Sequence, residues 1–306
     1  MKAQTKITFL DENENKFFGE GPAKLLHAIE EHGSLRTASM SMGMAYTKAL
    51  KILRNAENAL GFPLTTRTAG GKSGGGSRLT PKGMEWLIQY ENYRDACIRA
   101  NQQLYLEFFS DVGCVIMASG MGKRFGENKL LTDFNGKPLI SHILDITSGI
   151  FKKRIVVTRH PEIVNLCKEL DIEVIIHSLP HKSDTIRLGL EQMTDTKSCM
   201  FCTADQPLLQ KDTIVALVLE STNAPTKIIR PIFENTPGSP VIFPQWTYEE
   251  LLHLSEEQGG GYMIKKHPDF VQYLPVRNAY ELEDIDTKED VIRLQNFCAD
   301  STNSLR

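Results

Sequence analysis

The sequence has no long hydrophobic run. Within its 306 residues no apolar stretch approaches about 18 residues, the usual minimum for a membrane-spanning helix. The first ten residues lack the apolar core and the small-residue cleavage site of a secretory signal. We therefore expect no membrane span and no leader.

Cysteine is scarce. The six cysteines show no spacing typical of a disulfide framework, and the pair Cys199 and Cys202 is followed by no second metal-ligand pair. This pair also lies in an apolar run, residues 199–203, that reads as a buried strand. We interpret the two as core thiols rather than metal ligands, and we predict a reducing, cytoplasmic environment.

Excess charge of either sign is also missing. The net charge of -3 argues against a chain that coats nucleic acid along its whole length, although it leaves room for a local basic surface. The length suggests two domains. We place the boundary between residues 110 and 111, giving domains of residues 1–110 and 111–306.

A glycine-rich loop follows the apolar run of residues 112–118, which reads as a strand buried on both faces. Two common phosphate-binding motifs are absent. No Lys-Ser or Lys-Thr follows a glycine at P-loop spacing, and Phe125 stands where G-x-G-x-x-G needs its third glycine. The pattern present is G-x-G-x-R-x-G-x-x-K, in which glycine N–H groups and cations predict a polyphosphate cradle. An ordinary glycine turn is the alternative.

The loop supplies most of the expected nucleotide-binding residues, namely Ala118, Ser119, Gly120, Met121, Gly122, Lys123, Arg124 and Lys129. We expect Arg124 and Lys129 to hold the triphosphate during the reaction. Ser183, at the start of a later predicted helix, is a further candidate because helix N-termini bind anions. A solvated helix cap would explain Ser183 equally well.

The second domain alternates predicted strands and helices after the loop. Such alternation is typical of a doubly wound parallel sheet that binds ligands at the carboxyl ends of its strands. Residues 227–276 show less regular patterning. The strands are expected at residues 112–118, 154–158, 173–177 and 198–203. One helix is expected to end near residue 150, two more to span residues 161–170 and 183–193, and a final helix to end near residue 297.

Two aspartates from distant segments suggest a metal site. Asp205 follows the strand at residues 198–203, and Asp286 precedes the final helix. Mg²⁺ typically takes one or two carboxylates and completes its shell with phosphate oxygens and water. We therefore predict magnesium on these two residues, with Asp205 also catalytic. A turn aspartate and a helix N-cap are the respective alternatives.

The first domain has the pattern of a winged helix-turn-helix. Short helices are predicted at residues 35–41 and 45–60, after a strand at residues 5–10 and a helix from about residue 21. In this motif the second helix enters the major groove, so that its exposed side chains meet DNA. The basic, glycine-rich segment 66–82 carries no acidic residue and predicts a wing along the phosphate backbone. The expected DNA contacts are Tyr46, Thr47, Lys48, Lys51, Arg67, Lys72 and Arg78.

Residues 20–100 resemble the DNA-binding domain of the ModE family of molybdate-responsive regulators, most specifically in the wing Arg-Thr-Ala-Gly-Gly-Lys-Ser-Gly-Gly-Gly-Ser-Arg-Leu-Thr. The resemblance implies double-stranded DNA binding and a homodimer formed through a helix over residues 81–109. In that family an oxyanion-binding module follows, whereas here the enzyme-like segment follows directly. A domain that only dimerises the chain is therefore the alternative.

Residues 112–297 resemble the molybdenum cofactor cytidylyltransferases, the MocA-like branch of the MobA nucleotidyltransferase family. The resemblance rests on the glycine loop, Ala204-Asp205-Gln206-Pro207 and Asp284-Ile285-Asp286-Thr287, among other pieces. It implies a Rossmann-like α/β domain that transfers CMP from CTP to molybdopterin and releases pyrophosphate, with a molybdoenzyme receiving the product. GTP as the nucleotide, another phosphorylated acceptor, and a regulator that only senses its ligand remain open alternatives.

Overall fold

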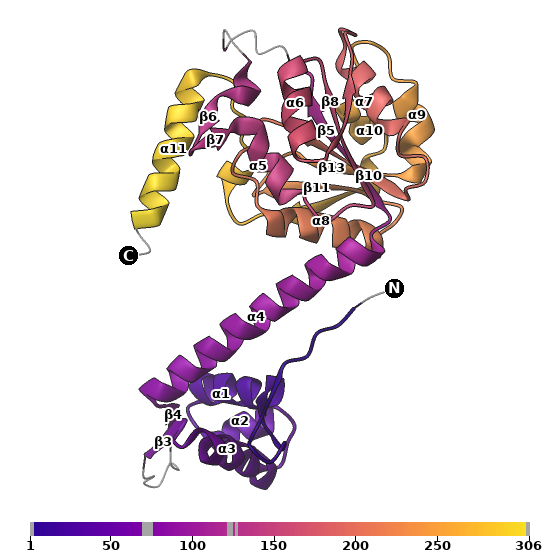
Figure 1. Ribbon diagram of the computed structural model, residues 1–306. Coiled ribbons are helices and arrows are strands. Elements are labelled where there is room, and N and C mark those ends of the chain that lie inside the picture. The colour runs from indigo at the N-terminus through magenta and orange to yellow at the C-terminus, as the bar shows by residue number, and fades with distance from the viewer. Residues whose placement is uncertain (1–2, 69–75, 121–124, 126–127, 304–306) are drawn as a thin grey trace. The chain divides into compact units, whose positions relative to one another are not determined.

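The chain folds into two compact units, Met1–Gln102 and Gln103–Arg306 (Figure 1). The computed structural model describes residues 3–68, 76–120, 125 and 128–303. The long helix α4, Pro81–Phe109, runs across the division between the units. The boundary that the sequence suggests, after residue 110, lies just beyond the end of this helix, and it stays a prediction.

The first unit is a helix-turn-helix with a short hairpin. Its α2 begins where Ser34 accepts a hydrogen bond from the Thr37 N–H, as expected of an N-cap. Gly43, with φ of 63°, makes the turn before α3. The strand expected at residues 5–10 begins only at Thr8. The elements before α4 are β1 (Thr8–Leu10), β2 (Lys16–Gly19), α1 (Glu20–His32), α2 (Leu35–Ser41), α3 (Tyr46–Leu60), β3 (Thr65–Thr68) and β4 (Gly76–Leu79).

The second unit is built on a mostly parallel sheet. Its described strands are ordered β12-β11-β13-β10-β5-β8-β9, and β14 pairs with β11. Strand β13 runs antiparallel to both β10 and β11, so the sheet is not wholly parallel as the alternation suggested. The strands are β5 (Val112–Ala118), β8 (Lys153–Thr158), β9 (Glu173–Ile176), β10 (Ser198–Thr203), β11 (Ile228–Phe233), β12 (Thr236–Pro237), β13 (Val241–Pro244) and β14 (Val271–Pro275).

Helices cover both faces of this sheet. One face packs against α5, α6 and α8, and the other against α7, α9 and α10 (Figure 1). The segment at residues 227–276, whose sequence patterning is less regular, contains four strands and two α-helices of the described chain. The remaining elements are β6 (Asp133–Phe134), β7 (Lys137–Pro138), α5 (Leu139–Ile146), α6 (Pro161–Glu169), α7 (Lys182–Leu190), α8 (Lys211–Asn223), α9 (Tyr248–Leu252), α10 (Gly260–Lys266) and α11 (Lys288–Asn303).

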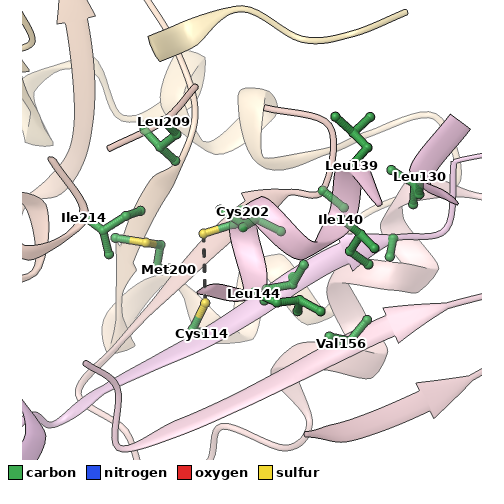
Figure 2. Packing of buried hydrophobic residues seen from close by; sticks show 14 of the residues in the cluster. Cys114, Leu130, Leu139, Ile140, Leu144, Val156, Met200, Cys202, Leu209 and Ile214 are labelled. Carbon is green, nitrogen blue, oxygen red and sulfur yellow. Dashed lines mark hydrogen bonds between the residues drawn. The ribbon is translucent and has the colours of Figure 1, made fainter. Parts of the chain in front are cut away.

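Cys199 and Cys202 are both fully buried, and they belong to the cores on opposite faces of the sheet. The interpretation as core thiols is therefore confirmed, because side chains three apart on a strand point away from each other. Cys202 packs beside Cys114, with the two sulfur atoms 3.9 Å apart, among side chains of α5 and α8 (Figure 2). The hydrogen bond with the Cys114 thiol, followed by burial, holds the pKa of Cys202 well above its usual range.

The last helix is longer than the sequence suggested. It continues to Asn303, where about residue 297 was expected, because no glycine or proline interrupts it. Thr287 caps this helix: its Oγ1 accepts from the Asp290 N–H, and Asp290 Oδ2 accepts from the Thr287 N–H. Asp286 is thus not the capping residue. None of the helices in the described residues is long and apolar enough to cross a membrane.

Candidate functional site

Three segments far apart in the sequence meet at the carboxyl end of the sheet. The ammonium of Lys129, in the 3₁₀ turn η1 (Lys129–Leu131), donates to Asp205 Oδ2 at 2.8 Å, to Asp286 Oδ1 at 2.9 Å and to the Ile285 carbonyl at 2.7 Å. Asp205 lies just after β10 and Asp286 just before α11. The Ile285 N–H donates to the Asp205 carbonyl at 2.9 Å, which joins the two acidic loops.

Burial and charge oppose each other at this cluster. Only 8% of Lys129 is exposed. Desolvation lowers the pKa of Lys129, but the attraction of Asp205 and Asp286 outweighs it and leaves the pKa above its usual range. The pKa of nearby Asp284 is raised as well, but by other causes. Desolvation at the crowded rim, followed by repulsion from the same two carboxylates, raises the pKa of Asp284 to about 6, even though its surface is open to solvent.

A pocket of about 330 Å³ opens beside the cluster. It lies where β5, β8 and β10 end, as expected for a parallel α/β sheet. Three buried polar atoms of its lining residues, Arg159 Nε, Thr203 Oγ1 and Asp205 Oδ1, have no hydrogen-bond partner in the described part of the protein. The lining residues are Met117, Ser119, Gly120, Lys129, Leu130, Arg159, Pro180, Lys182, Thr185, Thr203, Ala204 and Asp205.

Hydrogen bonds fix one wall of the pocket. The Leu179 N–H donates to Nδ1 of His177, which places the ring proton on Nε2, and Nε2–H then donates to Ser119 Oγ at 2.8 Å. Ser119 in turn donates to the Val157 carbonyl at 3.1 Å. Because its hydroxyl proton is engaged and His177 acts as a donor, this pair orients the loop and does not form a nucleophile with its base.

The structure brings several of the predicted residues to one place. Of the nucleotide-binding set, Ser119, Gly120 and Lys129 line the pocket, and so does Asp205, which was predicted as a metal ligand and catalytic residue. Ser183 does not: it is buried, and its hydroxyl donates to the Glu256 carbonyl at 3.4 Å. Ala118 is the fully buried last residue of β5. The predicted residues Met121, Gly122, Lys123 and Arg124 lie outside the described residues.

Other lining residues were missed from the sequence, among them Arg159, Lys182, Thr185 and Thr203, together with His177 beneath Ser119. One signal could have found three of them. Thr203 ends a predicted parallel strand, Arg159 directly follows one, and His177 directly follows the observed end of β9. Lys182 and Thr185 occupy the first turn of α7, beside the predicted Ser183.

The acidic residues fit a divalent cation that also binds phosphate. Among the described residues, no group of three or more histidine, cysteine, aspartate or glutamate side chains is placed to hold a metal by itself. Two carboxylates are nevertheless the protein share that Mg²⁺ usually takes, with phosphate oxygens and water completing its shell. One of them, Asp205, keeps a buried Oδ1 that has no partner among the described residues. Asp205 and Asp286 therefore have the chemistry that a magnesium site requires, and their role as magnesium ligands stays a prediction.

The first unit presents the predicted DNA-contacting helix to solvent. Ala49, Leu53 and Ala56 of α3 are buried in the unit's core. The predicted contacts Tyr46, Thr47, Lys48 and Lys51 are exposed, as is Arg78 of the hairpin. Lys72 and the side chain of Arg67 lie outside the described part of the chain.

The second unit is thus an α/β protein with an anion-suited pocket at the carboxyl ends of its strands. Residues 114–271 match the MobA-like NTP transferase domain, and the chain belongs to this family. The unit is a nucleotidyltransferase domain. In the first unit, residues 23–84 match the bacterial regulatory helix-turn-helix protein, lysR family. Both expected resemblances are confirmed at this level.

Known proteins resemble each unit separately. A probable molybdenum cofactor guanylyltransferase of Aquifex aeolicus is 27% identical over 59% of this chain and 89% of its own length. The molybdenum transport protein ModE of Herbaspirillum seropedicae is 41% identical over 21% of this chain and 23% of its own. The crystal structure of Rv0371c from Mycobacterium tuberculosis has the same fold, with a TM-score of 0.55 and 21% identity over 60% of this chain and 98% of that one.

Proposed function

We propose that the second unit transfers a nucleotidyl group from a nucleoside triphosphate to the phosphate of a molybdopterin-type cofactor and releases pyrophosphate. The observation that carries this proposal is the meeting of Lys129, Asp205 and Asp286 beside the pocket that Gly120 lines, in a MobA-like transferase domain. The guanylyltransferase relative supports the choice of acceptor.

The charges of the reactants define the task of the protein. The attacking phosphate oxygen is already anionic, so no general base is needed to activate it. Two mutually repelling anions must instead be held in line, and the charge that develops must be dispersed. Lys129 and the glycine loop with Arg124 hold the triphosphate in this proposal, and Arg159 and Lys182 add positive charge to the same pocket.

Asp205 and Asp286 would hold the magnesium ion, which supplies Lewis-acid polarisation of the phosphate when bound. Asp205 offers for this role a buried oxygen that has no partner in the described part of the chain, whereas Asp286 is largely exposed, with 59% of its side chain open. Asp286 can therefore reposition at little cost. The two residues approach the ion from loops that the Ile285–Asp205 backbone hydrogen bond keeps together.

The nucleotide distinguishes two versions of the proposal. Met117-Ala118-Ser119-Gly120 resembles the cytidylyl branch and favours CTP, whereas the Aquifex aeolicus relative favours GTP. The test offers CTP, GTP, ATP and UTP in turn with magnesium and purified molybdopterin, and measures pyrophosphate release. We expect release with CTP. Pyrophosphate release with GTP alone would identify GTP as the substrate in place of CTP. Binding of all four nucleotides without pyrophosphate release would contradict the transferase proposal.

We further propose that the first unit binds double-stranded DNA. Lys48 and Lys51 lie on the exposed face of α3, in a helix-turn-helix that is similar to ModE. Binding should weaken with salt. Replacing Lys48 by Ala should lower the slope of log affinity against log salt by about one, the value of one phosphate contact. Fluorescence anisotropy with molybdenum-gene promoter DNA measures this slope. The exposed Lys24, ion-paired with Glu20 on α1, gives a control variant, and an unchanged slope for Lys48→Ala would contradict the assignment.

A further inference from the structure

Lys129 is completely engaged in the structure. An ammonium group has three N–H donors, and here the three acceptors are Asp205 Oδ2, Asp286 Oδ1 and the Ile285 carbonyl. The side chain is also buried. The ammonium therefore occupies the position between two carboxylates that a cation bound by both would take.

The proposed function makes two demands on this cluster that conflict with the observed contacts. Lys129 is to bind the triphosphate, and Asp205 and Asp286 are to bind a divalent ion. A divalent ion cannot join the ammonium between the two carboxylates, because like charges repel strongly at this range. Lys129 in turn has no free N–H donor for a phosphate while it bonds to Asp205, Asp286 and the Ile285 carbonyl. The Lys129 side chain must first leave the carboxylates.

A purely structural ion pair would explain the contacts less well. Such a pair is stable when the remaining hydrogen-bonding capacity of its buried groups is satisfied. Asp205 Oδ1 is instead buried without a partner among the described residues, although its carboxylate already bonds to Lys129. The cluster thus keeps an unused ligand oxygen beside the pocket.

We infer that Lys129 is a resident counter-cation that blocks the divalent-metal position in the nucleotide-free protein and gives it up when a polyphosphate enters. This inference rests on the proposed function of the pocket. Lys129 lines the pocket itself, so that its flexible side chain can turn from the carboxylates to a phosphate oxygen. The free protein consequently binds divalent metal weakly, and metal enters together with the nucleotide.

The test measures Mn²⁺ binding to the full-length protein without nucleotide, by the loss of the free-ion electron paramagnetic resonance signal. Lys129→Gln removes the charge but keeps an amide donor, and Lys129→Met removes both. Each variant should bind Mn²⁺ more tightly than the wild type by roughly tenfold or more, because a unit charge at this distance has a large effect in a partly buried site. Lys129→Arg keeps the charge and should bind as weakly as the wild type.

Two controls locate the effect. Lys182→Met removes a positive charge from the same pocket, and should change Mn²⁺ affinity by less than about twofold if the gain depends on the carboxylate contacts. Asp205→Asn combined with Lys129→Gln should abolish the gained binding. Circular dichroism checks that each variant is folded, and Lys129→Gln serves if Lys129→Met is not.

The inference is overturned if Lys129→Gln binds Mn²⁺ no more tightly than the wild type, or if Lys182→Met gains as much. It is equally overturned if the nucleotide-free wild type already binds as tightly as the Lys129 variants. These outcomes leave pyrophosphate release by the wild type untouched. Failure of the inference is therefore distinguishable from failure of the proposed transferase activity.

Discussion

At the scale of single residues, the two aspartates of the candidate site differ in how far they are buried. Asp205 has 19% of its side chain exposed and keeps one buried oxygen without a described partner, whereas Asp286 lies mostly in solvent. Fixing a ligand before the reaction lowers the cost of organising it during the reaction. Asp205 is therefore the carboxylate whose loss should affect catalysis more.

Replacing Asp205 by Asn should lower kcat on the order of a hundredfold or more. Metal polarisation contributes several kcal/mol, and each ~1.4 kcal/mol is a factor of ten in rate. The fold should persist because Lys129 keeps its bonds to Asp286 and Ile285. Pyrophosphate release and thermal unfolding measure the two effects. Asp145→Asn breaks the exposed ion pair with Lys137 and serves as the control; equal activity in both variants would remove Asp205 from the mechanism.

His177 makes stability depend on pH. Burial, followed by the positive charge of Arg159, lowers the pKa of His177 in the folded protein, while Asp184 opposes and Arg187 reinforces the shift. The unfolded chain then binds more protons at mildly acidic pH, so stability is complete above the ordinary histidine pKa and falls as the pH drops through it toward the folded pKa. Protonation of His177 also places a proton on Nδ1, which can then no longer accept the hydrogen bond from the Leu179 N–H.

We expect the melting temperature of the wild type to fall more than that of His177→Gln between about pH 7.5 and pH 5.5, which brackets the usual histidine pKa of about 6.5. The glutamine cannot take up this proton. His253→Gln, at an exposed histidine, controls for the general effect of removing an imidazole. Parallel pH profiles for the wild type and His177→Gln would contradict the assignment.

At the scale of elements, helix α7 positions one wall of the pocket. It contributes Lys182 and Thr185 to the lining, and it packs closely on β5 through Gly189. A Cβ added at Gly189 would lie 2.5 Å from Val115 Cγ1, far inside normal contact. The glycine thus sets how near the helix lies to the central strand.

Gly189→Ala should destabilise the second unit by about 1–3 kcal/mol, the usual cost of overpacking a core. It should also weaken nucleotide binding, because α7 must shift and carries Lys182 with it. Gly261→Ala in α10 is the matched control: its Cβ meets no atom of the described residues within 4 Å, and a stabilisation of up to about 1 kcal/mol is expected. Thermal unfolding and nucleotide titration measure both variants. If Gly189→Ala changed neither the stability nor nucleotide binding, α7 would have to adjust to the added methyl group without cost.

Elements with both faces buried were predictable from local sequence, whereas the site was predictable only in part. The apolar runs at β5 and β10 gave strands with the expected bounds, since a short continuous apolar run is typical of a strand buried on both faces. Arg159 and His177 carry no such local signal. They belong to the site because parallel strands end at the same edge of the sheet, a relation between distant segments that no single run of residues shows. The antiparallel β13 was missed for the same reason.

At the scale of the whole molecule, the described residues form hydrophobic cores that belong to one unit or the other. One cluster lies in the first unit and contains Phe18, Leu26 and Tyr90. The two clusters on the sheet faces lie in the second unit and contain Leu106 and Val115, respectively. Helix α4 contributes its early residues to the first unit and its last ones to the second. Cores that share no residue can unfold separately.

We therefore expect two transitions in calorimetry of the full-length protein. Nucleotide with magnesium at about one hundred times its dissociation constant should stabilise the second unit by about 2.7 kcal/mol and raise that transition alone. A unit of this size gains about 2–4 °C per kcal/mol. Leu26→Ala, at a fully buried site of the first unit, should cost about 2–5 kcal/mol and lower the other transition alone. A single transition moved by both changes would mean that the two units unfold as one, and that ligand binding in the transferase unit bears directly on the stability of the helix-turn-helix.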